Sequence, residues 1–212
     1  MTRKIDMTLI TTTLVCLLPI ILSLALYNNL PNQIAIHWDS AGNPDNFAPK
    51  AIAVLGLPVL MAGIHIFSHF MIKNDPKKAN ASSVLKQLGR WIIPIMSVIL
   101  IPIILFKPLG YNIPIQIIAP AMVGVIIIVC GNYLPKCKQN YTVGIKLPWT
   151  LNSKENWNKT HHMAGYLWIV GGICIVIGSF LNINWLPIIL IIVAVLVGVP
   201  FMYSYLLYKK GI

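Results

Sequence analysis

Six long apolar runs, separated by polar connections, dominate the chain. They are rich in Ile, Leu, Val and Met, and each approaches the roughly 20 residues that a helix needs to cross the hydrocarbon core. The predicted spans are residues 7–27, 51–72, 91–109, 113–131, 164–181 and 185–208. The short alternating segments of a membrane β-barrel are not visible in the sequence. The pattern therefore predicts an all-α fold, a polytopic membrane helical bundle with six transmembrane helices.

The first run follows Arg3 and Lys4 and so resembles a secretory signal peptide. Its apolar stretch is longer than a signal-peptide core, and no small-x-small cleavage site precedes Tyr27. We therefore expect a retained helix. Prolines inside the predicted spans, where neighbouring helices can satisfy the freed carbonyls, predict kinks. They are at positions 19, 58, 94, 102, 120, 187 and 200.

Apolar residues make up 57% of the chain and charged residues 10%, whereas a soluble domain carries about 25% charged residues. This composition excludes a soluble globular protein. The net charge of +11 is compatible with nucleic-acid binding. The basic residues flank the apolar runs, however, which favours membrane topology and contact with lipid headgroups. The cysteines form no CxxC pair, and we expect core residues or a free thiol. They are Cys16, Cys130, Cys137 and Cys174.

Basic residues are distributed unevenly between alternate connections. If the N-terminus lies in the cytoplasm, fourteen of the sixteen Lys and Arg residues are cytoplasmic, and only Lys50 and Lys107 are external. The positive-inside rule therefore predicts that both termini are cytoplasmic.

Two connections are long enough to carry structure of their own. We divide the chain into an amino-terminal two-helix module, residues 1–72, with an external loop at 28–50, and a four-helix module, residues 73–212, with a cytoplasmic loop at 131–163. Ser82 to Arg90 is predicted to be an interfacial helix that runs into the third span. Residues 182–184 leave only a tight turn between the last two spans.

The external loop combines an extended segment with a turn. Apolar side chains alternate with others from Ile34 to Trp38, and turn-forming residues follow as far as Asp45. We consider two interpretations, an external recognition lobe and a structured cap that packs on the bundle. The candidate recognition residues are His37, Trp38, Asp39, Gly42, Pro44 and Asp45. The order HxDx₅D has no standard ligand spacing, so we predict no metal site.

The cytoplasmic loop is richer in polar and aromatic residues. A turn and an extended piece are predicted over 140–146, and a second turn over 148–150. Ser153 is a plausible N-cap for a helix that begins at about residue 154 and continues into the fifth span. That helix would carry Trp157, His161 and then Ala164 or Gly165 along one face. We expect Trp149 and Trp157 near the headgroups, and His161 with His162 as a helix cap and headgroup contact.

Catalysis and transport are alternatives. Glu155, His161 and Lys146 are the candidates for an enzyme at the inner headgroup level, but no HExxH, GxSxG, P-loop or GxGxxG motif occurs. A coupled transporter usually keeps an acid in mid-bilayer, and the predicted spans have none. His65 and His69 share a helix face at i, i+4. They predict hydrogen bonds across the bundle or a buried proton or metal site.

Both loops resemble one protein family. LPxxIxxHWxxxGxPDxxxxK, from Leu30 to Lys50, resembles an amino-terminal module of unknown function found in SdpI-like proteins. NYLPKCKQNYTVGIKLPWTLNSKENWNKTHHMAG, residues 132–165, closely resembles the cytoplasmic signature of the SdpI family. One departure is His162, where Arg is more usual in the family. Histidine retains a possible positive charge.

The resemblance implies immunity against a secreted sporulation-delaying peptide toxin, without a cofactor. It also implies a possible signalling role, in which a small helix-turn-helix repressor protein is held at the membrane and the chain itself contacts no nucleic acid. The toxin would meet the external loop or a groove between spans. A cytoplasmic partner would meet motif residues that provide hydrogen bonds and aromatic anchors. They are Asn132, Pro135, Asn140, Gly144, Lys146, Pro148, Trp149, Thr150, Asn156, Trp157, Thr160 and His161.

Overall fold

The computed structural model describes residues 6–80, 83–181 and 186–212. Within these ranges six helices are long and apolar enough to cross a membrane, which confirms the predicted fold class and span count. They are Met7–Asn29, Ile52–Lys73, Lys86–Leu109, Ile115–Lys136, Lys154–Ser179 and Leu186–Lys209. Three predictions lie outside the described residues: the placement of Arg3 and Lys4, the helix start at Ser82, and the turn at 182–184.

The chain forms two compact units. Unit 1 comprises the described parts of residues 1–71 and 87–115, and unit 2 those of residues 72–86 and 116–212. This grouping rests on spatial contacts, and the sequence division at residue 72 stays a prediction.

Pro19 divides the first span into two helices. These are α1 (Met7–Leu17) and α2 (Pro19–Leu26), followed by the 3-10 turn η1 (Tyr27–Asn29). Proline has no N–H and its ring disturbs the preceding turn, so the break occurs where a kink is expected. Asp6 caps α1, since its carboxylate accepts the N–H of Leu9 at 3.3 Å.

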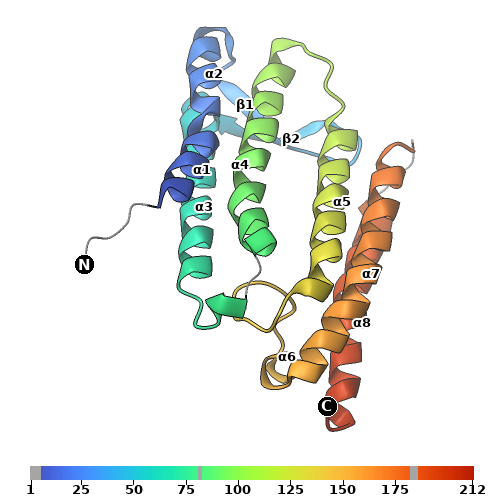
Figure 1. The fold of residues 1–212 in the computed structure, drawn as a ribbon. Coiled ribbons are helices and arrows are strands. Elements are labelled where there is room, and N and C mark those ends of the chain that lie inside the picture. Colours follow the sequence, from blue (N-terminus) through green and yellow to red (C-terminus); the bar gives the residue numbers. More distant parts are fainter. Residues whose placement is uncertain (1–5, 81–82, 182–185) are drawn as a thin grey trace, which may run out of the picture. The chain divides into compact units, whose positions relative to one another are not determined.

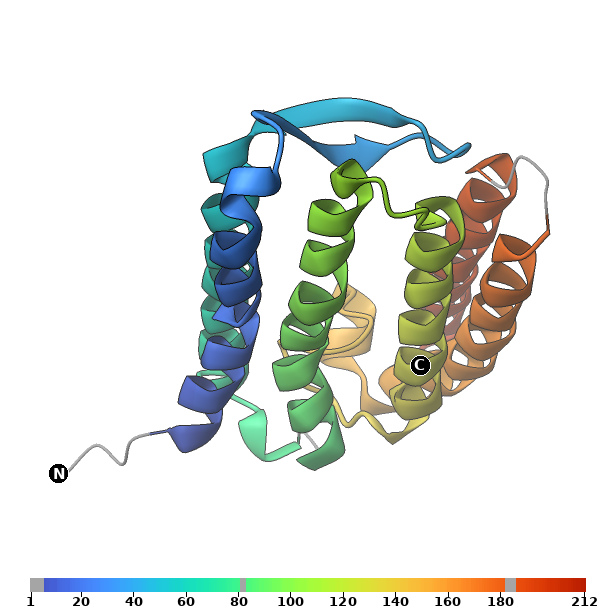
Figure 2. The same cartoon turned by 90° about the horizontal axis from the view of Figure 1, so that it is seen from above.

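A β-hairpin follows the first span in unit 1 (Figure 2). β1 (Gln33–Trp38) pairs antiparallel with β2 (Pro44–Pro49), with irregular register on either side of His37. Buried Ile34 joins a core cluster with residues of all three spans of the unit or their flanks. The cluster is Leu30, Ile34, Ala53, Val54, Ile101 and Leu105. The extended segment predicted up to Trp38 is confirmed.

The second and third spans complete unit 1. The π-helical segment η2 (Ile52–Gly56) runs into α3 (Leu57–Lys73). α4 (Ser83–Phe106) contains two prolines and continues into the 3-10 turn η4 (Lys107–Leu109). The hydroxyl of Ser97 on α4 donates to the carbonyl of Cys16 on α1 at 2.8 Å. A backbone carbonyl close to the break in the first span thus receives a side-chain donor from a neighbouring helix, as membrane helices interrupted by proline require.

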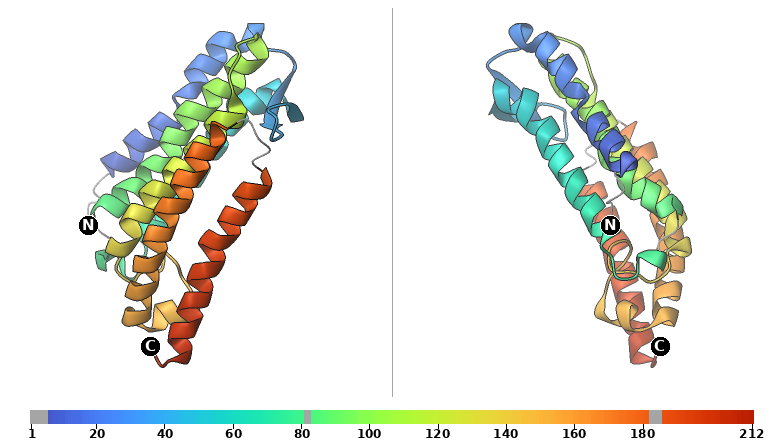
Figure 3. Two further views of the ribbon diagram at one scale, coloured as in Figure 1. Left: turned by 90° about the vertical axis from the view of Figure 1, so that its right-hand side faces the viewer. Right: turned by 60° about the vertical axis from the view of Figure 1, so that its left-hand side comes forward.

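Unit 2 contains the last three spans and the 131–163 loop. Its helices are η3 (Lys78–Asn80), α5 (Ile115–Tyr133), η5 (Leu134–Lys136), α6 (Pro148–Asn152), α7 (Lys154–Ser179) and α8 (Leu186–Lys209). α7 and α8 run side by side, with α6 next to one end of the pair (Figures 1 and 3). Ser153 caps α7 by accepting the N–H of Asn156 at 3.2 Å, as predicted. The helix then continues without a break into the fifth span.

Two glycine pairs let α5 and α7 approach closely. A Cβ on Gly172 would lie 2.7 Å from the carbonyl oxygen of Gly124, and a Cβ on Gly165 would lie 2.8 Å from that of Gly131. Within each helix the two glycines are seven residues apart, which is two turns, so both pairs fall on one contact line. Small residues at such a line are the usual means of close helix packing in lipid.

Candidate functional site

The 131–163 loop folds around its own polar side chains. Asn140 is 1% exposed, and its Oδ1 accepts the N–H groups of Thr142 at 2.9 Å and Val143 at 2.7 Å. Gln139 Nε2 donates to the carbonyls of Thr150 at 2.9 Å and Leu151 at 2.7 Å. These bonds join the start of the loop to α6, so a segment with little regular structure has its backbone groups satisfied.

Trp157 and His161 fix the loop to α7. Both side chains are 0% exposed and their rings stack at a centroid distance of 3.9 Å. Trp157 Nε1 donates to the carbonyl of Cys137 at 2.5 Å. The N–H of Ile145 donates to His161 Nε2 at 2.9 Å, while His161 Nδ1 lies 2.8 Å from the carbonyl of Trp157. His161 is therefore a neutral imidazole with its proton on Nδ1.

Gly144 lies where the loop meets both rings. Its φ is +110°, and a Cβ there would lie 2.5 Å from His161 Nε2 and 3.1 Å from Trp157 Cζ2. Only glycine combines this backbone conformation with so close an approach. The expectation that His161 contacts headgroups is wrong, because its side chain is fully buried against the loop. The expected position of Trp157 near the headgroups stays a prediction.

Thr150 stabilises the start of α6, and Asn156 joins the first turn of α7 to α8. Thr150 Oγ1 accepts the N–H of Leu147 at 2.8 Å and donates to the carbonyl of Ile145, also at 2.8 Å. The turn predicted at 148–150 is the first part of α6. Asn156 is buried and donates to the carbonyl of Ser204 on α8 at 2.9 Å, and the hydroxyl of Ser204 returns a bond at 2.6 Å.

Thr160 and Trp149 also make contacts within unit 2, and a cavity lies beside Trp149. The hydroxyl of Thr160 donates to Asn156 Oδ1 at 3.2 Å. Trp149 stacks on Tyr208 and meets Phe201 and Tyr205 edge-on. A cavity of about 430 Å³ lies beside it. Its lining residues are Pro148, Trp149, Asn152, Ser153, Tyr208, Gly211 and Ile212.

Asp75 lies outside the predicted site but holds the loop. It is 4% exposed and accepts the N–H of Tyr141 at 2.9 Å, the hydroxyl of Thr142 at 2.5 Å and the N–H of Lys77 at 2.7 Å. Burial raises the pKa of the Asp75 carboxyl, but these hydrogen bonds outweigh it and hold the pKa below its usual value. Sequence reasoning missed this residue because its partners in the loop are more than 60 positions away.

We expect Asp75→Asn to lower the melting temperature in detergent at pH 7 and to have a smaller effect at pH 3. A carboxyl whose folded pKa lies below its unfolded value of about 3.9 stabilises the folded state fully above that value. The stabilisation is lost as the pH falls through the folded pKa. Thermal unfolding of both proteins between pH 3 and pH 7 measures this. An equal destabilisation at both ends of the range would contradict a role for the Asp75 charge.

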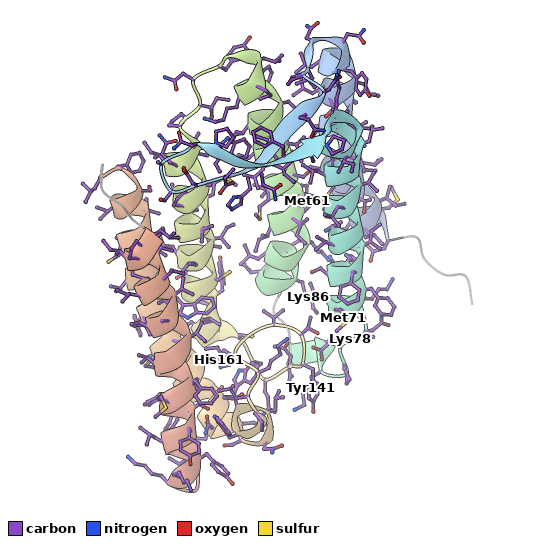
Figure 4. The ribbon with its side chains drawn as sticks, turned by 180° about the vertical axis from the view of Figure 1, so that it is seen from behind. Met61, Met71, Lys78, Lys86, Tyr141 and His161 are labelled. Atoms are coloured by element: carbon purple, nitrogen blue, oxygen red, sulfur yellow. The ribbon has the colours of Figure 1, made fainter. Side chains whose placement is uncertain are left out.

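The remaining predicted residues of the loop lie at its surface. Asn132, Pro135, Lys146 and Pro148 are exposed. In Figure 4, His161 lies on the α7 side of the loop, whereas Tyr141 and the neighbouring Lys78 of η3 lie on its other side. The motif therefore divides into buried residues that shape the loop and exposed residues that are accessible to a partner.

The three candidate catalytic residues are not brought together. His161 is enclosed between the loop and α7, as described above. Lys146 Nζ donates to the carbonyl of Thr142 at 3.0 Å, and exposed Glu155 pairs with Lys159 at 2.7 Å. Each side chain has a different neighbour, so the structure assembles no acid–base pair from them.

The hairpin presents a polar tip. His37 Nδ1 lies 2.6 Å from Asp45 Oδ1, and both side chains are exposed. Asp39 Oδ1 accepts the N–H groups of Asn43 at 2.8 Å and Ala41 at 2.9 Å, and these bonds to the turn backbone lower the pKa of its carboxyl. Gly42 has a φ of +86°, as the predicted turn requires.

The other candidates of the hairpin lie beside this turn. Pro44 is the first residue of β2, and Trp38, the last of β1, is half-buried. The structure thus places the six predicted residues along one short segment, with the side chains of His37 and Asp45 paired across the two strands.

His65 and His69 form hydrogen bonds across the bundle, to α1 and to its N-cap residue, as the first of the two interpretations predicted. His65 Nε2 lies 2.8 Å from Thr12 Oγ1, and His69 Nε2 lies 3.0 Å from the carboxylate of Asp6. Both imidazoles are buried. In the part of the chain that the structure describes, no three His, Cys, Asp or Glu side chains gather as a metal centre would require.

Comparison with known proteins matches both loops to families. Residues 136–204 match the SdpI/YfhL protein family, and residues 14–62 match a domain of unknown function, DUF1648. The chain is 27% identical over 198 residues to the Immunity protein SdpI of Bacillus subtilis strain 168, and the alignment covers 93% of each chain. No solved structure matches the chain.

These matches follow the order of the two motifs along the chain and cover the 131–163 loop from η5 onward. Together with the six apolar helices they make the chain a multi-pass protein of the cell membrane. The resemblance seen in the motifs is confirmed, because residues 136–204 match the SdpI/YfhL protein family and the alignment with the Immunity protein SdpI runs along 93% of the chain.

Proposed function

We propose that this chain is a membrane immunity protein that protects its cell against a secreted peptide toxin of the sporulation-delaying type. The observation that carries the proposal is the alignment over 93% of both chains with the Immunity protein SdpI. An alignment of this extent includes both connections that carry structure, the hairpin and the 131–163 loop, rather than a single shared helix.

In the proposed topology both termini are cytoplasmic. The hairpin follows the first span and faces outside, and the 131–163 loop follows the fourth span and faces the cytoplasm. The uneven distribution of Lys and Arg supports this orientation.

Toxin recognition is assigned to the tip of the hairpin. His37 and Asp45 present exposed polar groups, while Asp39, Gly42 and Pro44 fix the turn between the strands. Trp38, the last residue of β1, is half-buried beside this turn. Rigid placement of these groups lowers the entropy that would be lost on binding a peptide.

A cytoplasmic partner, such as a small helix-turn-helix repressor, is assigned to the surface of the 131–163 loop. The accessible residues for it are Asn132, Pro135, Lys146 and Pro148, with Trp149 beside them. The buried motif residues have internal partners, so their part in this binding is to hold the loop in shape. They are Asn140, Thr150, Asn156, Trp157, Thr160 and His161, and half-buried Gly144 lies against the rings of Trp157 and His161.

The test is protection of a sensitive host. We expect expression of the chain in a Bacillus subtilis strain that lacks its own SdpI to restore growth in the presence of purified sporulation-delaying peptide. His37→Ala with Asp45→Ala should reduce that protection, because both exposed polar groups of the tip are lost. Gln33→Ala, another exposed position of β1, is the matched control and should protect fully.

The amount of each variant in the membrane fraction is measured, and protection is compared only between cells that contain equal amounts. Unchanged sensitivity with wild-type chain present in the membrane would refute the immunity function. Full protection by the double variant would instead refute the assignment of recognition to His37 and Asp45.

A further inference from the structure

The connection between α3 and α4 belongs to unit 2, although most of both helices belongs to unit 1. Three of its side chains bind the 131–163 loop. Besides the bonds of Asp75, Lys77 Nζ donates to Gln139 Oε1 at 2.7 Å, and Asn80 Nδ2 donates to the carbonyl of Gln139 at 2.7 Å. We call the contacts of Asp75, Lys77 and Asn80 with residues 139–142 the Asp75 latch.

The latch is more than an incidental surface contact, because its buried carboxylate has hydrogen-bond donors on both oxygens. A buried carboxylate that accepts three hydrogen bonds is a strongly bonded arrangement, because bonds to charged groups are stronger than those between neutral groups. Lys77 also lies 5.0 Å from the ring centroid of Tyr141, a cation–π distance. Its ammonium therefore contributes a hydrogen bond and a ring contact on the same side of the loop.

The latch also lies directly after the second span, which begins where the hairpin ends. β2 ends at Pro49, and the helix Ile52–Lys73 begins three residues later. Asp75 follows the last residue of that helix by two positions. The helix has 22 residues, about 33 Å at 1.5 Å per residue. Along the chain, one continuous helix thus links β2 to Asp75, with only short connections at each end.

We propose that the Asp75 latch couples the hairpin to the 131–163 loop, so that a ligand on the hairpin changes the loop surface by moving this helix. This inference rests on the proposed function for its ligand, the peptide toxin. Asp75 is a positioning residue in this account. It contacts neither toxin nor partner, but sets the conformation in which Tyr141 and Thr142 are held.

The energetic requirement is a difference in toxin affinity between the latched and the released state. A toxin that binds one state more tightly shifts the balance toward it by that difference and by no more. Release of Asp75 breaks its hydrogen bonds with the N–H of Tyr141 and the hydroxyl of Thr142. The affected loop surface is then the one around Tyr141, which is 46% exposed.

The first arm of the test needs no toxin. Hydrogen exchange of the purified protein in nanodiscs should show the amide of Tyr141 exchanging at least about tenfold faster in Asp75→Ala, since a bond to a buried charge is lost. Thr142→Val should give a partial increase, and Thr142→Ser should restore the wild-type rate. Pro76→Ala, at an exposed position of the same connection, is the control. Unchanged exchange in Asp75→Ala would overturn the latch.

The second arm measures coupling. A reporter cysteine, Lys138→Cys, is introduced into a background with Cys130→Ala and Cys174→Ala, in which the two remaining native cysteines, Cys16 and Cys137, are buried. It is labelled with maleimide in inverted membrane vesicles with and without toxin applied to the hairpin side. We expect toxin to change the labelling rate at least about threefold in this protein, and the Asp75→Asn variant to show no change while it still protects cells.

The outcomes separate the two proposals. Loss of protection by the wild-type chain refutes the immunity function. Protection without any toxin-dependent labelling, or an equal response with and without the Asp75 carboxylate, refutes the coupling.

Discussion

Replacement of Gly144 with alanine should destabilise the 131–163 loop by about 2–5 kcal/mol. Two costs combine at this position. The φ of +110° is unfavourable for any residue with a Cβ, and the added atom would lie 2.5 Å from His161 Nε2. The ring cannot withdraw without losing its bonds to the N–H of Ile145 and the carbonyl of Trp157. The expected result is a melting temperature several degrees lower in detergent.

Gly110→Ala is the matched control for this prediction. Gly110 has a φ of +92°, but a Cβ added to it would meet no heavy atom within 4 Å. It therefore carries the backbone cost alone, and the difference between the two variants measures the clash with His161. Equal losses in the two variants would show that the close packing of Gly144 on the rings contributes nothing.

The second large effect is expected for Gly172→Leu, which should prevent close packing of α5 and α7. A Cβ at Gly172 would lie 2.7 Å from the carbonyl oxygen of Gly124 and 3.0 Å from the backbone nitrogen of Ile128. Backbone atoms of a helix cannot rotate away as a side chain can, so the two helices must separate. Overpacking of this kind costs about 1–3 kcal/mol or more, and it also forfeits the contacts of the neighbouring pair, Gly131 and Gly165.

Gly198→Leu supplies the comparison, because Gly198 lies in α8 and a Cβ added to it would have no heavy atom within 4 Å. A leucine at this position adds an apolar side chain without a steric clash. Size-exclusion profiles and thermal aggregation of both variants in detergent measure the outcome. We expect loss of the monodisperse, folded fraction for Gly172→Leu only. A normal profile for that variant would contradict the assigned glycine contact line.

In the hairpin, local sequence patterns predicted the first strand and the turn but not the second strand. Alternation predicted the extended segment of β1, and the Asp39–Asp45 stretch predicted the turn, because both depend on residues close in sequence. β2 was missed. Proline bounds it at both ends, and its side chains are exposed at four successive positions, so it has no alternating pattern. It is a strand because β1 supplies its hydrogen-bond partners.

The 131–163 loop shows the same limit more strongly. Its Asn and Thr residues suggested a surface for a partner, and the sequence offered no reason to bury them. In the structure Asn140, Thr150, Asn156 and Thr160 are at most 1% exposed, and their polar atoms bond to the loop, to α7 or to α8. Whether they also affect partner binding stays a prediction.

Local chemistry was enough to predict the number of spans, the kink at Pro19, the cap at Ser153 and the turn around Gly42. Each of these follows from hydropathy over about 20 residues or from interactions within one turn of the chain. Three features became visible only in the folded chain: Asp75 holds Thr142, Gly144 lies against His161, and glycines line the contact of α5 with α7. The physical reason is that burial and hydrogen bonding depend on which distant segments pack together, and no local pattern records that choice.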